Sequence, residues 1–441
     1  MNLVIKTALL STAVMLMAAS GCSNKPTQQT TEAQSLPTAA ASKPAPAGTL
    51  QVTLTGKTGP KGDLERLYGI SLRDPSNSDA ARKRLDQSPL KDRWINLPKS
   101  FIRHPAGSHT YKMKSMDDPN VNLVLNTILP QLPASVKHDF TWPPQFPRDQ
   151  VSRWVTERTG RISIGNEPPN HVPELFANGQ AYVTFAEEVY RANPKLADNF
   201  WIQSGKPEVV RHMGKGSPMG RKHGDCLDAA SKAVKAGRLP ARVITTHKLL
   251  PVYPADRLGF YREMLTDYRS YFGNDVLVCF QEFNYSDEEA ESLDQVLHVA
   301  EFLLILARLR NEEGNIVDGA AFHQGFAVGT SNLFGLDAKS GQGNWRAGGL
   351  ALVWEEFGNM MTDGSYAFSS ATNRPEDVEI EVFKKGANFY ALFSNKSVRP
   401  IPTTLNGVNI IYIDQTLGKK TEKFSGSLPA RSTGSVELTG I

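Results

Sequence analysis

Cysteine is scarce in this sequence, which has only three in 441 residues, at Cys22, Cys226 and Cys279. So few cysteines exclude a disulfide-built scaffold, and their spacing fits no metal-binding motif. An exported location would permit a disulfide between Cys226 and Cys279, while the alternative for Cys279 is a small buried residue in a strand. The sequence leaves that choice open.

The signatures of several functional classes are also missing. No cluster of lysine and arginine is interleaved with aromatic residues, and a net charge of +4 is small for this length. These features argue against nucleic acid as a partner and leave a mild preference for acidic ligands. No glycine-rich phosphate loop follows an early strand, and there is no Gly-x-Ser-x-Gly elbow of an acyl hydrolase. We therefore expect no cofactor, no metal and no obligate protein partner.

Beyond its first residues the chain has no apolar run long enough for a transmembrane helix. Residues 1–21 carry Lys6 and then a short apolar stretch, which is typical of a signal peptide. Ala19-Ser20-Gly21-Cys22 resembles the bacterial lipobox, in which the cysteine is lipidated; the alternative is an ordinary cleaved signal with an incidental Cys22. Ser23 after the cysteine then implies an outer-membrane lipoprotein, on the periplasmic or the cell-surface face, that touches the membrane only through its lipid anchor.

Composition and hydrophobic period divide the mature chain. Residues 22–48 are rich in Thr, Gln, Ala, Ser and Pro, which predicts a disordered tether after lipidation. Residues 49–64 contain an alternating strand that we expect to join a C-terminal β-domain. Strand and helix patterns fill residues 65–364. In residues 365–441 apolar and polar residues alternate with a period of two, which predicts an antiparallel β-sandwich.

Eight strand candidates lie within residues 65–364, and each is followed by a crossover. They cover residues 66–72, 100–105, 135–142, 161–167, 200–203, 242–247, 274–284 and 316–323. Strand–helix units with buried strands predict a parallel sheet, and eight of them predict a closed (β/α)8 TIM barrel of the α/β class. An open doubly wound sheet is the alternative fold, which the missing phosphate loop disfavours.

Two of these strands end in a glutamate. One stops at Gly165-Asn166-Glu167-Pro168, where the proline cannot continue a ladder, and the other stops at Gln281-Glu282-Phe283-Asn284. Barrels place their chemistry at the carboxyl ends of strands. Two carboxylates there can cleave a glycosidic bond, one as an acid and one as a nucleophile or base. Asn-Glu-Pro alone also occurs in surface turns, so the pairing of the two glutamates carries the argument.

These two motifs resemble the clan A, or 4/7, superfamily of retaining glycoside hydrolases, with the nearest layout in its β-xylosidase, arabinofuranosidase and heparanase-like branches. The resemblance implies that Glu167 is the catalytic general acid/base and that Glu282 is the nucleophile. It also implies that Asn166 binds the hydroxyl next to the scissile bond. Gln281 departs from the superfamily, in which Thr or Ser usually precedes the nucleophile.

Five further residues are candidates for substrate binding. Arg103 resembles the second-strand arginine that supports the nucleophile, with a structural ion pair as the alternative. His247, with Tyr253 just beyond it, resembles the sixth-strand His/Tyr region, and His247 could also be a core histidine. Trp142 ends a strand and could stack on a sugar face or belong to the core. His323 ends the eighth strand and could reach a sugar hydroxyl.

The sequence therefore predicts a tethered retaining O-glycosidase that cleaves a poly- or oligosaccharide by double displacement. The alternative function is a non-catalytic carbohydrate-binding or polysaccharide-assembly lipoprotein built on the same barrel.

Overall fold

The structure, a computed structural model, describes residues 48–58, 64–72, 90–104, 113, 124–171, 173–240, 242–249, 256–284, 291–312, 317–323, 325–328, 333–336, 345–362 and 366–440. The chain divides into two units, Met1–Pro44 and Ala45–Ile441, and all the described residues lie in the second. The predicted signal peptide and Cys22 lie outside them, as does the tether apart from Gly48. Among the described helices, none combines the length and the hydropathy needed to cross a membrane.

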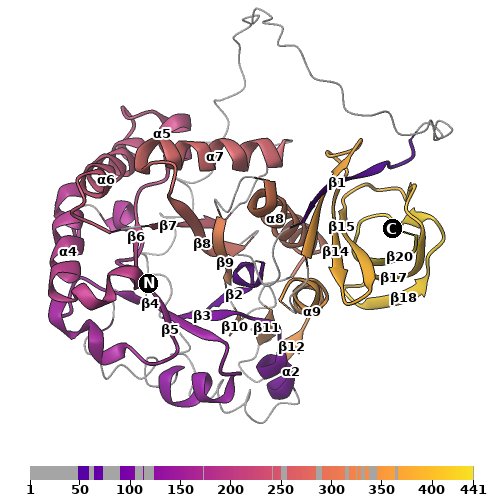
Figure 1. The fold of residues 1–441 in the computed structure, drawn as a ribbon, viewed down its shortest axis with the longest axis horizontal. Helices are drawn as coiled ribbons and strands as arrows, with labels where there is room; N and C mark the ends of the chain where they lie inside the picture. Colours follow the sequence, from indigo (N-terminus) through magenta and orange to yellow (C-terminus); the bar gives the residue numbers. More distant parts are fainter. Residues whose placement is uncertain are drawn as a thin grey trace, which may run out of the picture. The chain divides into compact units, whose positions relative to one another are not determined.

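Eight parallel strands close into a barrel in the order of the sequence (Figure 1). They are β2 (Gly69–Ser71), β3 (Phe101–His104), β4 (Lys137–Trp142), β5 (Thr159–Ile164), β6 (Phe200–Gln203), β7 (Val243–Leu249), β8 (Leu277–Asn284) and β9 (Val317–His323). Ser71 of β2 lies opposite both Arg103 and His323, which closes the ring. The predicted barrel is confirmed. Glu167 follows its fourth strand and Glu282 lies in its seventh.

Helices surround the strands (Figure 1). The α-helices are α2 (Leu90–Asn96), α4 (Gly179–Ala192), α5 (Pro207–Met213), α6 (Pro218–Lys235), α7 (Arg257–Phe272), α8 (Leu293–Glu312) and α9 (Gly349–Met361). Shorter helical turns are η1 (Glu65–Leu67), η4 (Val124–Ile128), η5 (Leu129–Gln131), η6 (Arg148–Trp154), η7 (Pro168–His171) and η8 (Pro194–Asn199). Side chains of Asn178, Ser217 and Asp256 cap α4, α6 and α7, because each accepts a hydrogen bond from a free amide of the first turn.

Alternation along the barrel strands separates an apolar outer face from an inner face that carries the polar residues of the site. Phe140 of β4 and Ile162 of β5 pack in the main core with the helices. Phe140 and Ile162 are opposite each other, and the next pair in register is Thr141 and Ser163. Thr141 points inward and accepts a hydrogen bond from Arg103 at 3.1 Å. Because side chains alternate with period two, the two faces of each strand have opposite roles.

A second, antiparallel sheet follows the barrel. Its order is β1 (Val52–Thr58), β13 (Tyr366–Thr372), β14 (Val378–Lys385), β15 (Asn388–Asn395), β20 (Ser432–Leu438), β17 (Gly407–Ile413) and β18 (Lys419–Lys423). β16 (Ile401–Pro402) pairs with β19 (Ser427–Leu428), and β10 (Phe326–Val328), β11 (Phe334–Leu336) and β12 (Trp345–Ala347) form a small separate sheet. The described strands thus give one seven-stranded sheet with a hydrophobic core of its own. That this domain is a β-sandwich stays a prediction.

The barrel and the seven-stranded sheet share a buried interface. Phe383 of β14 and Leu392 of β15 belong to the same hydrophobic core as the barrel helices. Arg308 of α8 forms ion pairs with Glu379 at 2.7 Å and with Glu381 at 2.5 Å, and all three side chains are nearly inaccessible to solvent. This interface therefore resembles the interior of a single domain more than a contact between independent ones.

Candidate active site

The backbone turn after β5 determines where Glu167 lies. Gly165 has a φ of 75° and Glu167 a φ of 44°, so both residues occupy the left-handed region. Glycine adopts this conformation freely, but a glutamate there is strained by about 1–3 kcal/mol, and such strain is concentrated at functional sites. The amide of Glu167 donates a hydrogen bond to Oε1 of Gln203 at 2.6 Å, which holds the turn against β6.

A β-bulge in β8 brings Glu282 into the barrel. Gln281 donates to Ser163 inside the barrel, and the next residue, Glu282, is also inside, where it pairs with Arg103. Two consecutive inward side chains break the alternation of a regular strand. The register shows how this happens, because Thr246 lies opposite Phe280 and His247 lies opposite Glu282, so that β8 has one residue more than β7.

The two carboxylates meet at one imidazole. Nδ1 of His247 lies 3.2 Å from Oε1 of Glu167 and 3.3 Å from Oε2 of Glu282. The two oxygens can be no further apart than the sum of these contacts. This upper limit equals the shortest carboxylate separation of inverting glycosidases, in which it is about 6.5–9.5 Å. The separation of about 5–5.5 Å found in retaining glycosidases lies within the limit.

Exposure distinguishes the two carboxylates. The Glu167 side chain is 28% exposed and that of Glu282 is 5% exposed. Glu167 can therefore be reached by solvent and a departing group, whereas Glu282 is held inside the barrel.

Arg103 organises the inner side of the site. One end of its fully buried guanidinium pairs with Oε1 of Glu282, and Nη2 donates to Oδ1 of Asn166 at 2.8 Å as well as to Thr141. A charge-assisted bond to a buried arginine keeps a carboxylate ionised and fixes its orientation. Arg103 therefore connects the residue before Glu167 with Glu282.

His323 lies on the other side of Glu282. Its Nδ1 is 3.6 Å from Oε2 of Glu282, and its carbonyl accepts a hydrogen bond from Asn284 at 2.6 Å. Asn284 in turn accepts a hydrogen bond from Gln295 of α8 at 2.9 Å. A surrounding helix thus supports this histidine, and His323 faces Glu282 from the eighth strand.

The surrounding charges keep both glutamates ionised. Burial raises the pKa of Glu282, but the charges of His247, His323 and Arg103 outweigh it and lower this pKa to about 2. Burial also raises the pKa of Glu167, while a protonated His247 and the ammonium of Lys206 lower it, and the net shift is downward.

Trp142 does not reach this site. Its side chain is fully buried on the outside of the barrel, where it packs edge-on against Phe146 and Trp154 at ring distances of 5.6 and 5.4 Å. The prediction that it stacks on a sugar is wrong, because Thr141 is the inward residue of β4 and alternation turns its neighbour outward. Tyr253 lies outside the described residues.

Sequence reasoning missed several residues that contact Glu167, among them Gln203 and Lys206. Gln203 ends β6 and points inward. Trp201, two residues earlier, could have indicated this direction, because side chains two apart on a strand share a face and Trp201 packs inside the barrel with Cys279. Lys206 follows in the next loop, and its Nζ lies 3.8 Å from Oε1 of Glu167. No pattern in the sequence indicates this second contact.

Cys226 and Cys279 are both free thiols and both buried. They are therefore not joined to each other, which resolves the choice that the sequence left open. Among the described residues no group of His, Cys, Asp and Glu side chains could hold a metal ion.

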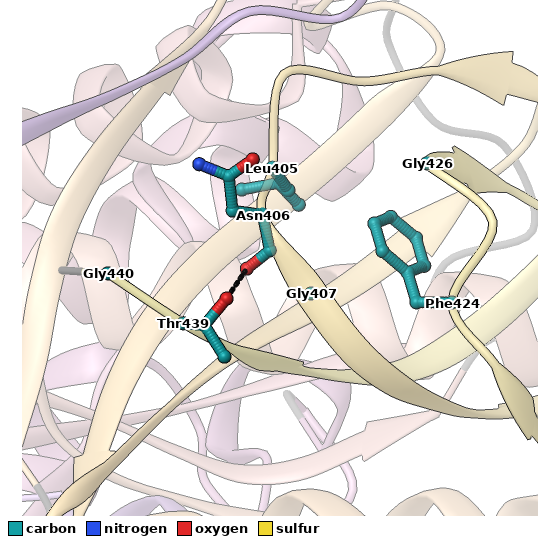
Figure 2. Close-up of a pocket in the computed structure, with 7 residues that line it drawn as sticks. All are labelled: Leu405, Asn406, Gly407, Phe424, Gly426, Thr439 and Gly440. Carbon is teal, nitrogen blue, oxygen red and sulfur yellow. Dashed lines mark hydrogen bonds between the residues drawn. The ribbon is translucent and has the colours of Figure 1, made fainter.

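A pocket of about 470 Å³ lies in the C-terminal sheet, between the ends of β17, β18 and β20 (Figure 2). It is lined by Leu405, Asn406, Gly407, Phe424, Gly426, Thr439 and Gly440. Thr439 donates a weak hydrogen bond to the carbonyl of Asn406 at 3.5 Å across its edge. None of the lining residues is acidic or basic, so this pocket offers no group for acid–base chemistry.

No protein-family model matches the sequence, and no curated protein sequence resembles it significantly. The fold, however, is similar to that of solved glycoside hydrolases. The catalytic domain of GH30 xylanase C from Talaromyces cellulolyticus is 12% identical, with a TM-score of 0.53 over 89% of this chain and 100% of its own. BuGH86wt, in complex with neoagarooctaose, is 11% identical, with a TM-score of 0.61 over 88% of this chain and 78% of its own. A conserved exported protein from Bacteroides fragilis is 12% identical, with a TM-score of 0.58 over 88% and 100%.

These similarities show the fold alone. The chain shares an eight-stranded parallel barrel with solved glycoside hydrolases, and the two glutamates lie on its fourth and seventh strand–helix units.

Proposed function

We propose that this protein is a retaining glycoside hydrolase that cleaves a poly- or oligosaccharide by double displacement. The observation that carries the proposal is the convergence of Glu167 and Glu282 on Nδ1 of His247, from the ends of two strands that are three units apart. Two carboxylates of different exposure at such a separation suit the division between a proton donor and a nucleophile.

In the first step, a carboxylate oxygen of Glu282 forms a bond to the anomeric carbon while the bond from that carbon to the glycosidic oxygen breaks. Glu167 gives its proton to the departing oxygen. Arg103 and His323 orient Glu282 for attack, and Asn166 donates from its amide nitrogen to the neighbouring sugar hydroxyl, since its oxygen accepts from Arg103.

In the second step, Glu167 removes a proton from a water molecule, which attacks the anomeric carbon and releases Glu282 as a carboxylate. Two inversions at one carbon give net retention. His247 contacts both carboxylates and can supply or take up the proton that Glu167 exchanges between the steps.

We also propose that the enzyme is exported and anchored by a lipid on Cys22, with residues 22–48 as a tether and residues 365–441 as an accessory β-sandwich. The signal-like start of the sequence and the fold shared with an exported protein support this location.

The proposal is tested by screening protein that starts at Gly48 against a panel of polysaccharides and aryl glycosides. We expect release of reducing sugar, and the anomeric proton of the first-formed product should show retained configuration by NMR. Glu282→Ala should lower turnover by at least about 10³-fold.

Glu167→Ala separates the acid from the nucleophile. It should slow substrates with poor leaving groups by about 10²–10⁴-fold and those with good leaving groups far less, because only the former need protonation. Equal losses on both substrates, an inverted product, or tight glycan binding without any turnover would contradict the assignment, and the last result would favour a non-catalytic carbohydrate-binding lipoprotein.

A further inference from the structure

Lys206 is the one lysine that forms an ion pair with a proposed catalytic carboxylate within the described part of the chain. Its Nζ lies 3.8 Å from Oε1 of Glu167, which is too long for a hydrogen bond, and its side chain is 25% exposed. The ammonium thus keeps its donors for another partner while it remains accessible from the mouth of the barrel.

The backbone at Lys206 is fixed. Its amide donates to Nδ1 of the buried His223 at 3.0 Å, and the residue occupies the N-cap position of α5, just before Pro207. Burial, with the charge of Lys206, lowers the pKa of His223 to about 4, so this histidine is neutral near pH 7 and accepts the bond. The position of the lysine is therefore built into the fold, and only its side chain is free to turn.

A cation at this point opposes the role of Glu167. A general acid must carry a proton before it can donate one, and a neighbouring ammonium favours the ionised form. Lys206 would slow the first step for a neutral substrate. Its presence becomes favourable if a substrate anion draws the ammonium away from Glu167.

The charges that act on the neighbouring histidines are mixed. His171 feels the negative charges of Glu167 and Glu174 and the positive charge of Lys222, and Glu208 acts on His223 from a buried position. By contrast, basic residues further along are neutralised. Arg211 pairs with Glu263 and Asp267, and Lys215 pairs with Asp228 at 2.6 Å.

We propose that Lys206 is a specificity-determining residue that binds a carboxylate or sulfate group on the leaving-group side of an anionic polysaccharide. This inference rests on the proposed function, because only a hydrolase has a leaving-group side. Binding of an anion at Lys206 does not itself require turnover. Lys206 forms its ion pair with Glu167, the proposed proton donor, which places its ligand on the side from which the sugar departs. Binding of the anion releases Glu167 from the ammonium and so allows it to hold a proton.

The test measures binding without turnover. In the Glu282→Gln background, calorimetry would compare three probes of similar length, namely oligogalacturonate with carboxylates, carrageenan oligosaccharide with sulfates, and neutral neoagaro-oligosaccharide. We expect at least one anionic probe to bind tenfold or more tightly than the neutral one, and the preferred probe identifies the anion. Lys206→Met should remove that preference and leave the affinity for the neutral probe within twofold.

Lys215→Met is the matched control, because Lys215 is an exposed lysine that already has a carboxylate partner, and it should leave all three affinities unchanged. The proposal is overturned if the neutral probe binds as tightly as both anionic ones, or if Lys206→Met weakens all three equally. With active enzyme and a neutral aryl glycoside, Lys206→Met should also move the alkaline limb of kcat/KM to higher pH. Anion binding that depends on Lys206 in a protein without hydrolytic activity would refute the proposed function and keep this site.

Discussion

Arg103 donates a hydrogen bond from Nη2 to Oδ1 of Asn166 at 2.8 Å, and the same guanidinium pairs with Glu282. The arginine therefore couples the turn that carries Glu167 to the strand that carries Glu282. Because the Asn166 oxygen accepts this bond, the NH₂ end of its amide is directed elsewhere, as a donor to substrate requires. One buried cation thus holds two of the residues to which we assign a role, Asn166 and Glu282.

Replacing Arg103 with lysine should reduce kcat/KM by about 10²-fold or more, since an ammonium cannot form both directed contacts at once. The acid limb of the pH–rate profile should move upward, because loss of the guanidinium raises the pKa of Glu282 from about 2. Kinetics between pH 3 and 8 would measure both effects. Arg153→Lys, at an exposed arginine, should change neither, and an unmoved acid limb in Arg103→Lys would argue against the support role.

The strained backbone at Glu167 makes a prediction about stability. Glu167→Gly should be more stable than Glu167→Ala by about 1 kcal/mol, since glycine accepts a φ of 44° without strain. Urea denaturation of the two variants would give the difference. A more stable alanine variant would mean that this turn is not strained in solution.

The ion pairs of Arg308 predict that barrel and sheet unfold together. Arg308→Met should lower the free energy of unfolding by about 3 kcal/mol, because it leaves Glu379 and Glu381 buried without this cation. Replacing both glutamates with glutamine in the same variant should recover part of the loss. Two separate unfolding transitions in the wild type would contradict a shared interior.

A buried histidine predicts how stability depends on pH. Burial, with a smaller effect of Arg158, lowers the pKa of His138 to about 3. The unfolded chain binds a proton at this position near pH 6.5 and the folded protein does not, so stability falls as the pH drops from about 6.5 towards 3, by about 1.4 kcal/mol per pH unit for one group.

Urea denaturation at pH 7 and pH 5 would show this loss in the wild type and a smaller loss in His138→Phe. His212→Asn, at an exposed histidine, should retain the wild-type dependence. An identical pH dependence in His138→Phe would exclude His138 as the cause.

The barrel and its two glutamates could be predicted because both depend on local patterns. Buried strands alternate with helices, and each glutamate lies where a strand pattern stops. Side-chain direction could not be predicted at the same positions. Trp142 is the last residue of β4, follows the regular alternation and faces outward, while Glu282 faces inward because a β-bulge interrupts the alternation of β8.

Contacts across the barrel mouth could not be predicted from the sequence either. Arg103 and His247 were candidates because their strands matched a known layout, and the structure brings both to the glutamates. Lys206 had no such guide, since its contact with Glu167 depends on how a loop after β6 leaves the barrel. Long-range geometry of this kind is set by packing and has no counterpart in periodicity or composition.

The bulge in β8 makes the backbone conformation of that strand a determinant of activity in its own right. With Gln281 in place, straightening the bulge into regular alternation would turn the following carboxylate towards the helices, although no amino acid had changed. Removing Gln281 would instead place that carboxylate directly after the outward Phe280, where it would still face inward opposite His247.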